Sequence, residues 1–193
     1  MGGGDKPLLS LGKARLIDHV AARLKPQVAM LGVNANGDPA RFAGMGLPVI
    51  EDTVPGHAGP LAGILAGLEW AAGQKGCRWL MSAAGDTPFF PDNLVERLAA
   101  ATRERPDAIA VASSGGRWHP TFALWPLSLR DALRHFLVDE ENRRVSAVME
   151  RHGHVEVEFP MIEAGGQKID PFFNVNTPDD LAVAERLLQS LRP

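Results

Sequence analysis

Apolar residues along this chain alternate between helical spacing and short unbroken runs. From Leu16 to Leu24 they fall three or four positions apart, which predicts an amphipathic helix over 13–24. The run 28–33 is apolar almost throughout and is closed by a turn-prone Asn-Ala-Asn-Gly, so it predicts a strand. A helix followed by a strand is therefore the first unit of the pattern.

The same alternation continues to the end of the chain. Further strands are expected at 47–50, 79–84, 108–112 and 155–159, a further apolar segment at 118–125, and helices over 59–68, 91–103, 129–137, 145–152 and 178–191. The run 79–84 indicates a strand buried on both faces of a parallel sheet. Strands separated by helices indicate βαβ units, so we expect an α/β fold in one domain spanning 1–193, without repeats or linkers.

Composition narrows the class of protein. The chain has 193 residues, of which 45% are hydrophobic and 22% charged, as in ordinary globular domains. A formal charge of -3 gives no general basic surface for nucleic acid, and no apolar run reaches the roughly 18 to 20 residues of a membrane span. Cys77 is the single cysteine, which excludes an intrachain disulfide. We expect a cytoplasmic protein.

Polar residues at the ends of the predicted strands are the candidates for chemistry, because open α/β sheets bind ligands beyond the carboxyl ends of their strands. These candidates are Asn34, Asp52, Asp86 and the turn 174–178. A carboxylate at the position of Asp86 can hold a magnesium ion that bridges phosphate oxygens. The alternative for Asp86 and Asp52 is a simple turn residue. The set contains no Ser-His-Asp arrangement.

Two glycine-rich segments could approach a phosphate. Gly2–Gly4 with Lys6 combine close backbone approach with a cation, although the alternative is a floppy terminus. The segment 59–63 could present a helix N-terminus to an anion, or could simply allow close packing of a helix on the sheet.

Other polar residues have plainer interpretations. His119 is interpreted as solvated, as a histidine in a loop usually is, with contact to a substrate as the alternative. His152 and His154 could suggest a metal site, but no third ligand accompanies them, so they too are interpreted as solvated. Arg143 and Arg144 form either an exposed helix face or a clamp for an anionic substrate.

Seven segments match one family in order and spacing. They are MGGGDKPLL (1–9), VNAN (33–36), VIED (49–52), GPLAG (59–63), GDTPF (85–89), HPTFAL (119–124) and NVNTPDDL (174–181). Together they resemble molybdenum cofactor guanylyltransferase. GPLAG and GDTPF are shared by nucleotidyltransferases in general, whereas the last two segments are more specific.

The resemblance implies a Rossmann-like three-layer nucleotidyltransferase fold with a mostly parallel sheet. It also implies an enzyme that joins GMP from GTP to molybdopterin and releases pyrophosphate. By this resemblance Asp86 holds Mg²⁺, Lys6 neutralises the triphosphate, and Asn34 and Asp52 contact guanosine, with Gly63 close to the nucleotide. Such in-line phosphorus chemistry depends on positioning and charge neutralisation, which explains why no protein nucleophile is found.

For the acceptor, the resemblance implies that Asn174 and Asn176 face the pterin or assist at the metal, and that Arg144 contacts the acceptor. It leaves open whether the chain is a monomer or a weak oligomer, and which molybdoenzymes or chaperones receive the product. Two alternatives remain: a related enzyme using CTP or a sugar phosphate, and a catalytically inactive nucleotide-binding regulatory subunit.

The family signature begins with a central strand and a glycine-rich loop, of which this chain carries only the second half. We therefore expect the first central strand to be missing here, and an upstream extension of roughly 15 to 20 residues to supply it. Without that strand its two neighbours would keep unpaired backbone groups beside a slot in the core.

Overall fold

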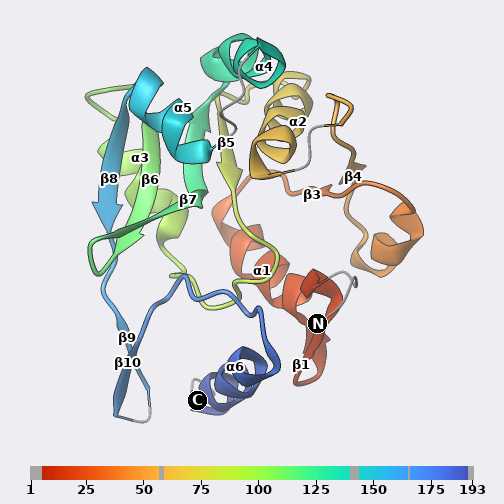
Figure 1. Ribbon diagram of the computed structural model, residues 1–193, viewed down its shortest axis with the longest axis vertical. Coiled ribbons are helices and arrows are strands. Elements are labelled where there is room, and N and C mark those ends of the chain that lie inside the picture. Colours follow the sequence, from red (N-terminus) through yellow and green to blue (C-terminus); the bar gives the residue numbers. More distant parts are fainter. Residues whose placement is uncertain (1–5, 57–58, 140–143, 165, 191–193) are drawn as a thin grey trace.

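The computed structural model describes residues 6–56, 59–139, 144–164 and 166–190. Figure 1 shows the arrangement of its elements. In chain order these are η1 (Lys6–Leu8), β1 (Ser10–Leu11), β2 (Ala14–Arg15), α1 (Leu16–Leu24), η2 (Lys25–Gln27), β3 (Val33–Asn34), η3 (Pro39–Met45), β4 (Val49–Ile50), α2 (Pro60–Ala72), β5 (Trp79–Ser82), α3 (Leu94–Ala101), β6 (Ile109–Ser114), β7 (Arg117–Pro126), η4 (Leu127–Leu129), α4 (Arg130–Asp139), α5 (Val145–His152), β8 (His154–Glu158), β9 (Ile162–Ala164), β10 (Gln167–Ile169) and α6 (Pro178–Ser190).

The main sheet has the strand order β5-β7-β6-β8. Strands β6 and β8 are parallel, while β7 is antiparallel to both β5 and β6. The reason is the connection between β6 and β7, which consists of Gly115 and Gly116 with φ values of 55° and 74°. Two successive positive φ angles form the tight turn that returns a strand antiparallel to its predecessor. The α/β class is confirmed, and its sheet is mixed.

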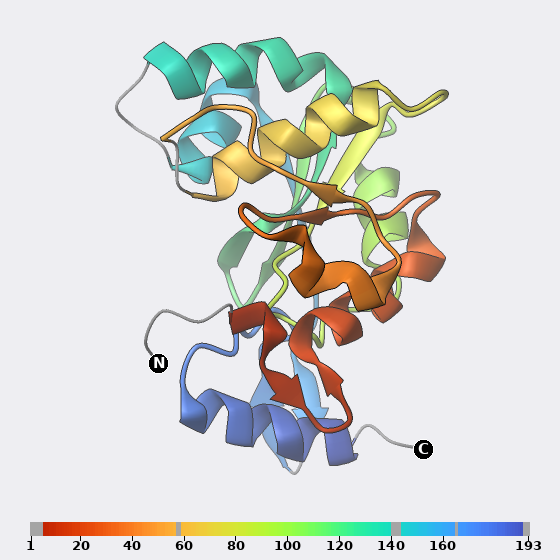
Figure 2. The same cartoon turned by 90° about the vertical axis from the view of Figure 1, so that its right-hand side faces the viewer.

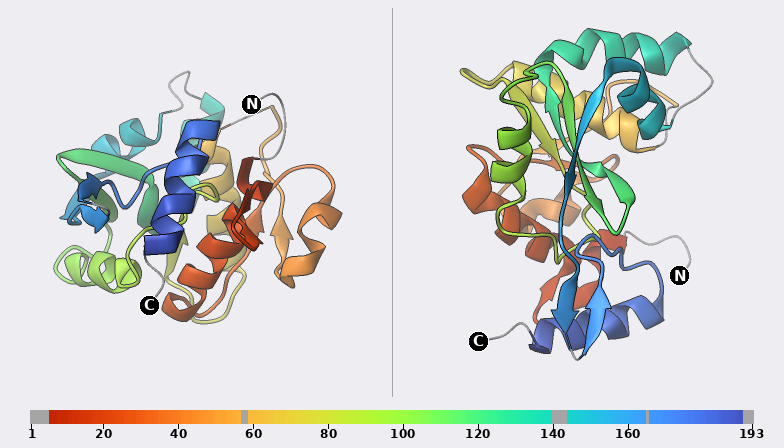
Figure 3. Two further views of the ribbon diagram at one scale, coloured as in Figure 1. Left: turned by 90° about the horizontal axis from the view of Figure 1, so that it is seen from below. Right: turned by 90° about the vertical axis from the view of Figure 1, so that its left-hand side faces the viewer.

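Helices cover both faces of this sheet, as the two side views in Figures 2 and 3 show. Alternate residues of β6 and β7 point to opposite faces. Val111 and Trp125 pack with α2, α4 and α5, whereas Ala112 and Phe122 pack with α1 and α3. The sheet is therefore the middle layer of three, with an apolar core on each side.

A second, two-stranded parallel sheet pairs Val33 with Val49 and Asn34 with Ile50. Among the described residues, β3 pairs only with β4, and β5 pairs only with β7. The strand predicted at 28–33 is thus reduced to β3, because a hydrogen-bonded ladder cannot extend without a neighbour. The prediction that 79–84 is buried on both faces of a parallel sheet is wrong: β5 is half-buried and has an antiparallel neighbour.

Below the carboxyl ends of the strands, α6 packs with β1 and the β9-β10 hairpin around Leu11, Val175 and Leu187. Thr177 is the N-cap of α6 as predicted, since its Oγ1 accepts the Asp180 backbone N–H at 3.1 Å. The predicted end of this helix at residue 191 lies outside the described residues. No helix in the described part of the chain is long and apolar enough to cross a membrane.

Candidate active site

Three polar side chains meet where β3 and β4 end. The Asn34 Nδ2 donates to Asp52 Oδ1 at 2.9 Å and to the Ile50 carbonyl at 3.0 Å. The Asn36 Nδ2 donates to Asp52 Oδ2 at 2.8 Å, and the Asp52 backbone N–H donates to Asn36 Oδ1 at 2.9 Å. Both carboxylate oxygens of Asp52 are therefore held by amides. The loops after the two strands form one preorganised group.

Gly63, in the first turn of α2, lies directly against this group. A Cβ atom at Gly63 would stand 2.2 Å from Asn34 Oδ1, far inside any allowed contact. Only glycine lets the helix approach the Asn34 side chain this closely. Gly63 therefore both allows close packing of α2 and lies beside the candidate site.

A second polar group surrounds Asp86, which follows β5. The Asp86 carbonyl accepts the Val175 backbone N–H at 3.0 Å. The buried hydroxyl of Thr87 donates to Asn174 Oδ1 at 2.7 Å and lies 3.3 Å from Asp86 Oδ1. The loop before α6 is thereby fastened to the end of β5.

Lys6 joins this second group from the other end of the sequence. Its Nζ donates to Asn176 Oδ1 at 3.2 Å, across 170 positions of the chain. The Asn176 backbone N–H is in turn held by Asp180 Oδ2 at 2.9 Å. The glycines of the predicted phosphate loop, Gly2–Gly4, lie outside the described residues.

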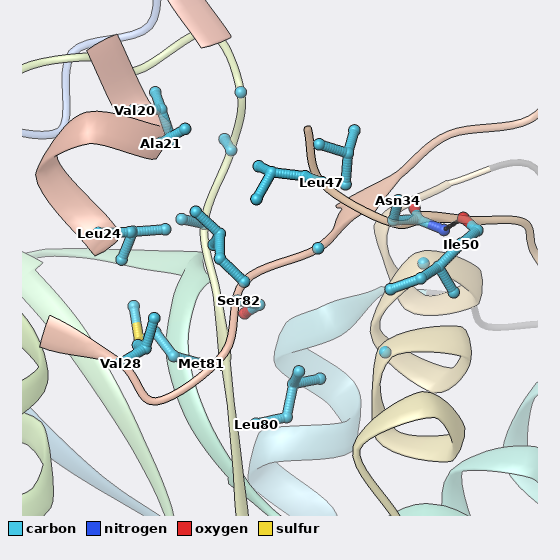
Figure 4. A pocket seen from close by; sticks show the side chains of 18 of the residues that line it. Val20, Ala21, Leu24, Val28, Asn34, Leu47, Ile50, Leu80, Met81 and Ser82 are labelled. Carbon is cyan, nitrogen blue, oxygen red and sulfur yellow. Dashed lines mark hydrogen bonds between the residues drawn. The ribbon is translucent and has the colours of Figure 1, made fainter. Parts of the chain in front are cut away.

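The two groups border the same cavity of about 890 Å³. Asn34 and Gly63 line it from one side, and Gly85 and Asp86 line it from the other. Figure 4 shows Asn34 at one edge of the cavity, between β3 and α2. The structure thus places Asn34, Asp52, Asp86 and the turn that holds Asn174 and Asn176 at the carboxyl ends of the strands, with Gly63 against Asn34 and Lys6 bonded to Asn176. The roles of these residues in binding stay predictions.

Arg144 is exposed and occupies the N-cap of α5, and its contact with an acceptor stays a prediction. Its neighbour Arg143 lies outside the described residues.

The interpretation of His119 as solvated is wrong. The ring is buried, stacks on Phe172 with 4.5 Å between centroids, and its Nε2 lies 2.7 Å from Ser114 Oγ. The Ser114 hydroxyl also donates to Asp170 Oδ1 at 2.7 Å. Burial lowers the pKa of His119, and the Asp170 carboxylate partly opposes that shift.

A serine, a histidine and an aspartate from outside the set of strand-end candidates meet here, but not as a hydrolytic triad. In such a triad the carboxylate and the hydroxyl lie on different ring nitrogens. Here Asp170 Oδ2 is 3.6 Å from the same Nε2 that faces Ser114. Asp170 Oδ1 also accepts the Phe172 backbone N–H at 2.8 Å. The cluster therefore shapes the loop that leads to Asn174.

The other two histidines are also not fully solvated. His152 is half-buried, and burial lowers its pKa. His154 packs edge-on against Trp118 with 4.3 Å between ring centroids. Within the residues that the structure describes, no group of three or more His, Cys, Asp or Glu side chains could hold a metal ion.

Two residues of the site were not among the predicted site residues. Asn36 holds Asp52 as Asn34 does, and Thr87 links Asp86 to Asn174. A signal for Asn36 was present, because residues two apart at a strand end point the same way. For Thr87 the sequence offered only a turn-forming residue type, since its partner is 87 positions away.

The sequence profile of the MobA-like NTP transferase domain matches residues 1–155. The chain is 63% identical over 191 residues to a protein of Mesorhizobium japonicum named molybdenum cofactor guanylyltransferase, covering 99% of this chain and 91% of that protein. The chain belongs to the molybdenum cofactor guanylyltransferase family. It is accordingly an enzyme, a nucleotidyltransferase.

A second relative and a solved structure agree with this family assignment. A Bradyrhizobium protein of the same name is 50% identical over 188 residues, covering 97% of this chain and 86% of its own length. The crystal structure of the molybdopterin-guanine dinucleotide biosynthesis protein A from Archaeoglobus fulgidus aligns with a TM-score of 0.71 at 22% identity, covering 98% of this chain and 93% of that one. At that identity the match shows the shared fold, and it confirms the Rossmann-like α/β arrangement.

Proposed function

We propose that this enzyme transfers GMP from GTP to molybdopterin, or to the molybdenum cofactor, and releases pyrophosphate. The observation that carries the proposal is that Asn34, which is bonded to Asp52, and Asp86 line one cavity. The hydrogen-bonded pair Lys6–Asn176 lies next to Val175, whose backbone N–H donates to the Asp86 carbonyl. Relatives at 63% and 50% identity carry the name of this reaction.

The group formed by Asn34, Asn36 and Asp52 is the proposed guanosine site. Its amides are already bonded to the carboxylate, so the order that a nucleoside would require is present before binding. Preorganised polar groups raise affinity because fewer side chains must be immobilised on binding.

The second group, formed by Lys6, Asp86, Thr87, Asn174 and Asn176, is the proposed phosphate and metal site. Lys6 is exposed and can neutralise the triphosphate. Mg²⁺ takes oxygen ligands and is commonly held by one or two carboxylates together with substrate phosphates, which fits Asp86 with the amide oxygens of Asn174 and Asn176. When bound, the ion would neutralise charge on the phosphate oxygens.

The reaction needs no protein nucleophile. A phosphate oxygen of the acceptor attacks the α-phosphorus of GTP, the bond to the bridging oxygen breaks, and pyrophosphate leaves. The residues of the chain position the two substrates and neutralise the charge of the phosphates. Asn174, Asn176 and Arg144 are the proposed acceptor contacts. A cytoplasmic location, the oligomeric state and any molybdoenzyme or chaperone partner remain predictions.

The test compares Asp86→Ala with a control, Asp92→Ala. The side chain of Asp92 is 82% exposed, and its carboxylate pairs with Arg23. Asp86→Ala should abolish GMP transfer from GTP with Mg²⁺ while leaving the melting temperature nearly unchanged, because the lost interaction serves the transition state. Asp92→Ala should keep the parental rate. A folded Asp86→Ala protein with near-parental turnover would contradict the assignment of Asp86.

Calorimetric titration with GTP, CTP and ATP tests the choice of nucleotide. Preference for GTP supports the proposal. Equal affinity for all three would favour a related nucleotidyltransferase, and tight GTP binding without any transfer would favour the inactive regulatory subunit.

A further inference from the structure

The segment 170–176 carries Asn174 and Asn176, two of the proposed acceptor contacts. It lies within the described range 166–190, between β10 and α6, and belongs to no helix or strand. Figure 1 shows it crossing from the β9-β10 hairpin to α6 below the ends of the central strands. Such a segment has no hydrogen-bonded ladder of its own, so its contacts with other elements must fix the two asparagines.

The two ends of the segment 170–176 are held by different elements. Near α6, the bonds of Asn174 and Val175 described above fasten it to the end of β5. Near β10, Asp170 closes a turn: its Oδ1 accepts the Phe172 backbone N–H at 2.8 Å, and its carbonyl accepts the Phe173 backbone N–H at 3.1 Å. An aspartate favours such a turn because its side chain can accept the N–H two residues on.

Ser114, at the end of β6, fastens this turn to the main sheet. Its side chain is buried, and its hydroxyl donates to Asp170 Oδ1 at 2.7 Å. The ring of Phe172 enters the core beside it, with ring centroids 5.0 Å from Phe122 and 5.5 Å from Phe159. One polar and one aromatic contact therefore fix the turn on the sheet.

His119 supports both of these contacts. A carboxylate accepts hydrogen bonds and does not donate them, so the single hydroxyl proton of Ser114 goes to Asp170. Ser114 Oγ must then accept from His119 Nε2, which lies 2.7 Å away and therefore carries a proton. The same ring stacks on Phe172 with 4.5 Å between centroids. His119 thus orients the Ser114 hydroxyl and packs against the turn.

The preceding residue, Ser113, makes an equivalent bond to another element. Successive residues of a strand point to opposite faces. The buried hydroxyl of Ser113 donates to Glu158 Oε2 at 2.7 Å, and the Gly115 backbone N–H donates to Glu158 Oε1 at 2.8 Å. Ser113 therefore fastens β6 to the end of β8, whereas Ser114 fastens it to the segment 170–176.

We infer that Ser114 and Asp170, supported by His119, are positioning residues for Asn174. Asn174 follows Asp170 by only four positions, so a displaced turn would shift Asn174 where it meets the end of β5. The structural part of this inference concerns the free protein. Its kinetic part rests on the proposed function, in which Asn174 contacts the acceptor.

Hydrogen exchange of the Val175 backbone amide, followed by NMR in the free protein, tests the structural part. Ser114→Ala should speed this exchange by about threefold to tenfold, the usual effect of one hydrogen bond. Ser113→Ala is the matched control, because it also removes a buried hydroxyl that donates to a carboxylate at 2.7 Å. It should leave the exchange of Val175 unchanged. Equal acceleration in both variants, or none in Ser114→Ala, would overturn the inference.

Two substitutions at Asp170 separate its hydrogen bonds from its charge. Asp170→Asn keeps an Oδ1 that can accept from Ser114 and from the Phe172 backbone, since asparagine forms the same turn. Val175 should then exchange as in the parent. Asp170→Ala removes both bonds and should speed exchange at least as much as Ser114→Ala. If Asp170→Asn behaves like Asp170→Ala, the charge acts and not the position, and the inference is wrong.

Steady-state kinetics of GMP transfer test the kinetic part. Ser114→Ala should lower kcat/KM for the molybdopterin acceptor by about threefold to tenfold. Its Kd for GTP without Mg²⁺ should be unchanged, because the Asn34–Asp52 group belongs to the other sheet. Ser113→Ala should keep both parental values. Parental acceptor kinetics in Ser114→Ala, or weaker GTP binding as its only defect, would overturn the link to the reaction.

The two sets of measurements also separate this inference from the proposed function. If the parent transfers no GMP, the proposed function fails. The exchange of Val175 in the Ser114 and Asp170 variants still decides whether these residues position the segment 170–176.

Discussion

The contact between Gly63 and Asn34 gives a sharp test of how the nucleoside group is held. Replacing Gly63 by alanine would put a Cβ 2.2 Å from Asn34 Oδ1 and 3.0 Å from Asn34 Cγ, so the amide must leave its place. It would then lose its hydrogen bonds to Asp52 and to the Ile50 carbonyl, at 2.9 and 3.0 Å. The perturbation acts on Asp52 through Asn34.

The size of the effect follows from these two bonds. Each contributes about 0.5 to 1.5 kcal/mol net, and the groups are exposed, so the lower part of that range applies. A loss of about 1 to 2 kcal/mol in orienting Asp52 corresponds to roughly fivefold to thirtyfold weaker GTP binding. The melting temperature should change little, because water replaces the lost partners.

The assay is a double-mutant cycle on GTP affinity, measured by calorimetry. Gly63→Ala and Asn34→Ala should each weaken binding by a similar factor, and the double variant should be no worse than either, because both remove the same interaction. Gly44→Ala is the matched control, since a Cβ at Gly44 meets nothing within 4 Å.

Two outcomes would refute this reasoning. If the effects of the two substitutions multiply in the double variant, Gly63 acts on the nucleotide directly and not through Asn34. If Gly63→Ala binds GTP as the parent does, the Asn34–Asp52 bond does not matter for the nucleoside.

Two further predictions concern pH. Hydrogen bonds from the Asn176 and Thr177 backbones and from the Thr177 side chain hold the pKa of Asp180 below its usual range. The contribution of the Asp180 carboxylate to stability is therefore complete above about pH 4 and is lost as the pH falls through the lowered pKa. The difference in melting temperature between the parent and Asp180→Asn should accordingly shrink toward zero in acid. A difference that is constant from pH 7 to pH 2.5 would contradict this. Burial lowers the pKa of His119, so protonation favours the unfolded chain and stability should fall as the pH drops below about 6.5. In urea titrations His119→Gln should show a smaller fall between pH 7.5 and 5.5 than the parent, and an equal fall in both proteins would assign the effect to other groups, such as His152.

The sequence by itself determined where most elements lie and which residues stand at their ends. The period of the apolar residues gives α1 and α5, and the capping residue Thr177 marks the start of α6, because side-chain periodicity and capping are properties of neighbouring positions. The motifs around Asn34, Asp52 and Asp86 also pointed to the correct family without any knowledge of contacts.

Only the tertiary structure decided which of those ends meet. Thr87 reaches Asn174 and Lys6 reaches Asn176 across most of the chain, and the burial of His119 depends on Phe172 and Asp170 from another segment. The shortened β3 and the half-buried β5 likewise depend on which strands pair with them, not on their own residues. A local pattern specifies how a segment folds, but a strand's extent and a polar side chain's partner are set by what packs beside it, and that neighbour is chosen by the topology of the whole chain.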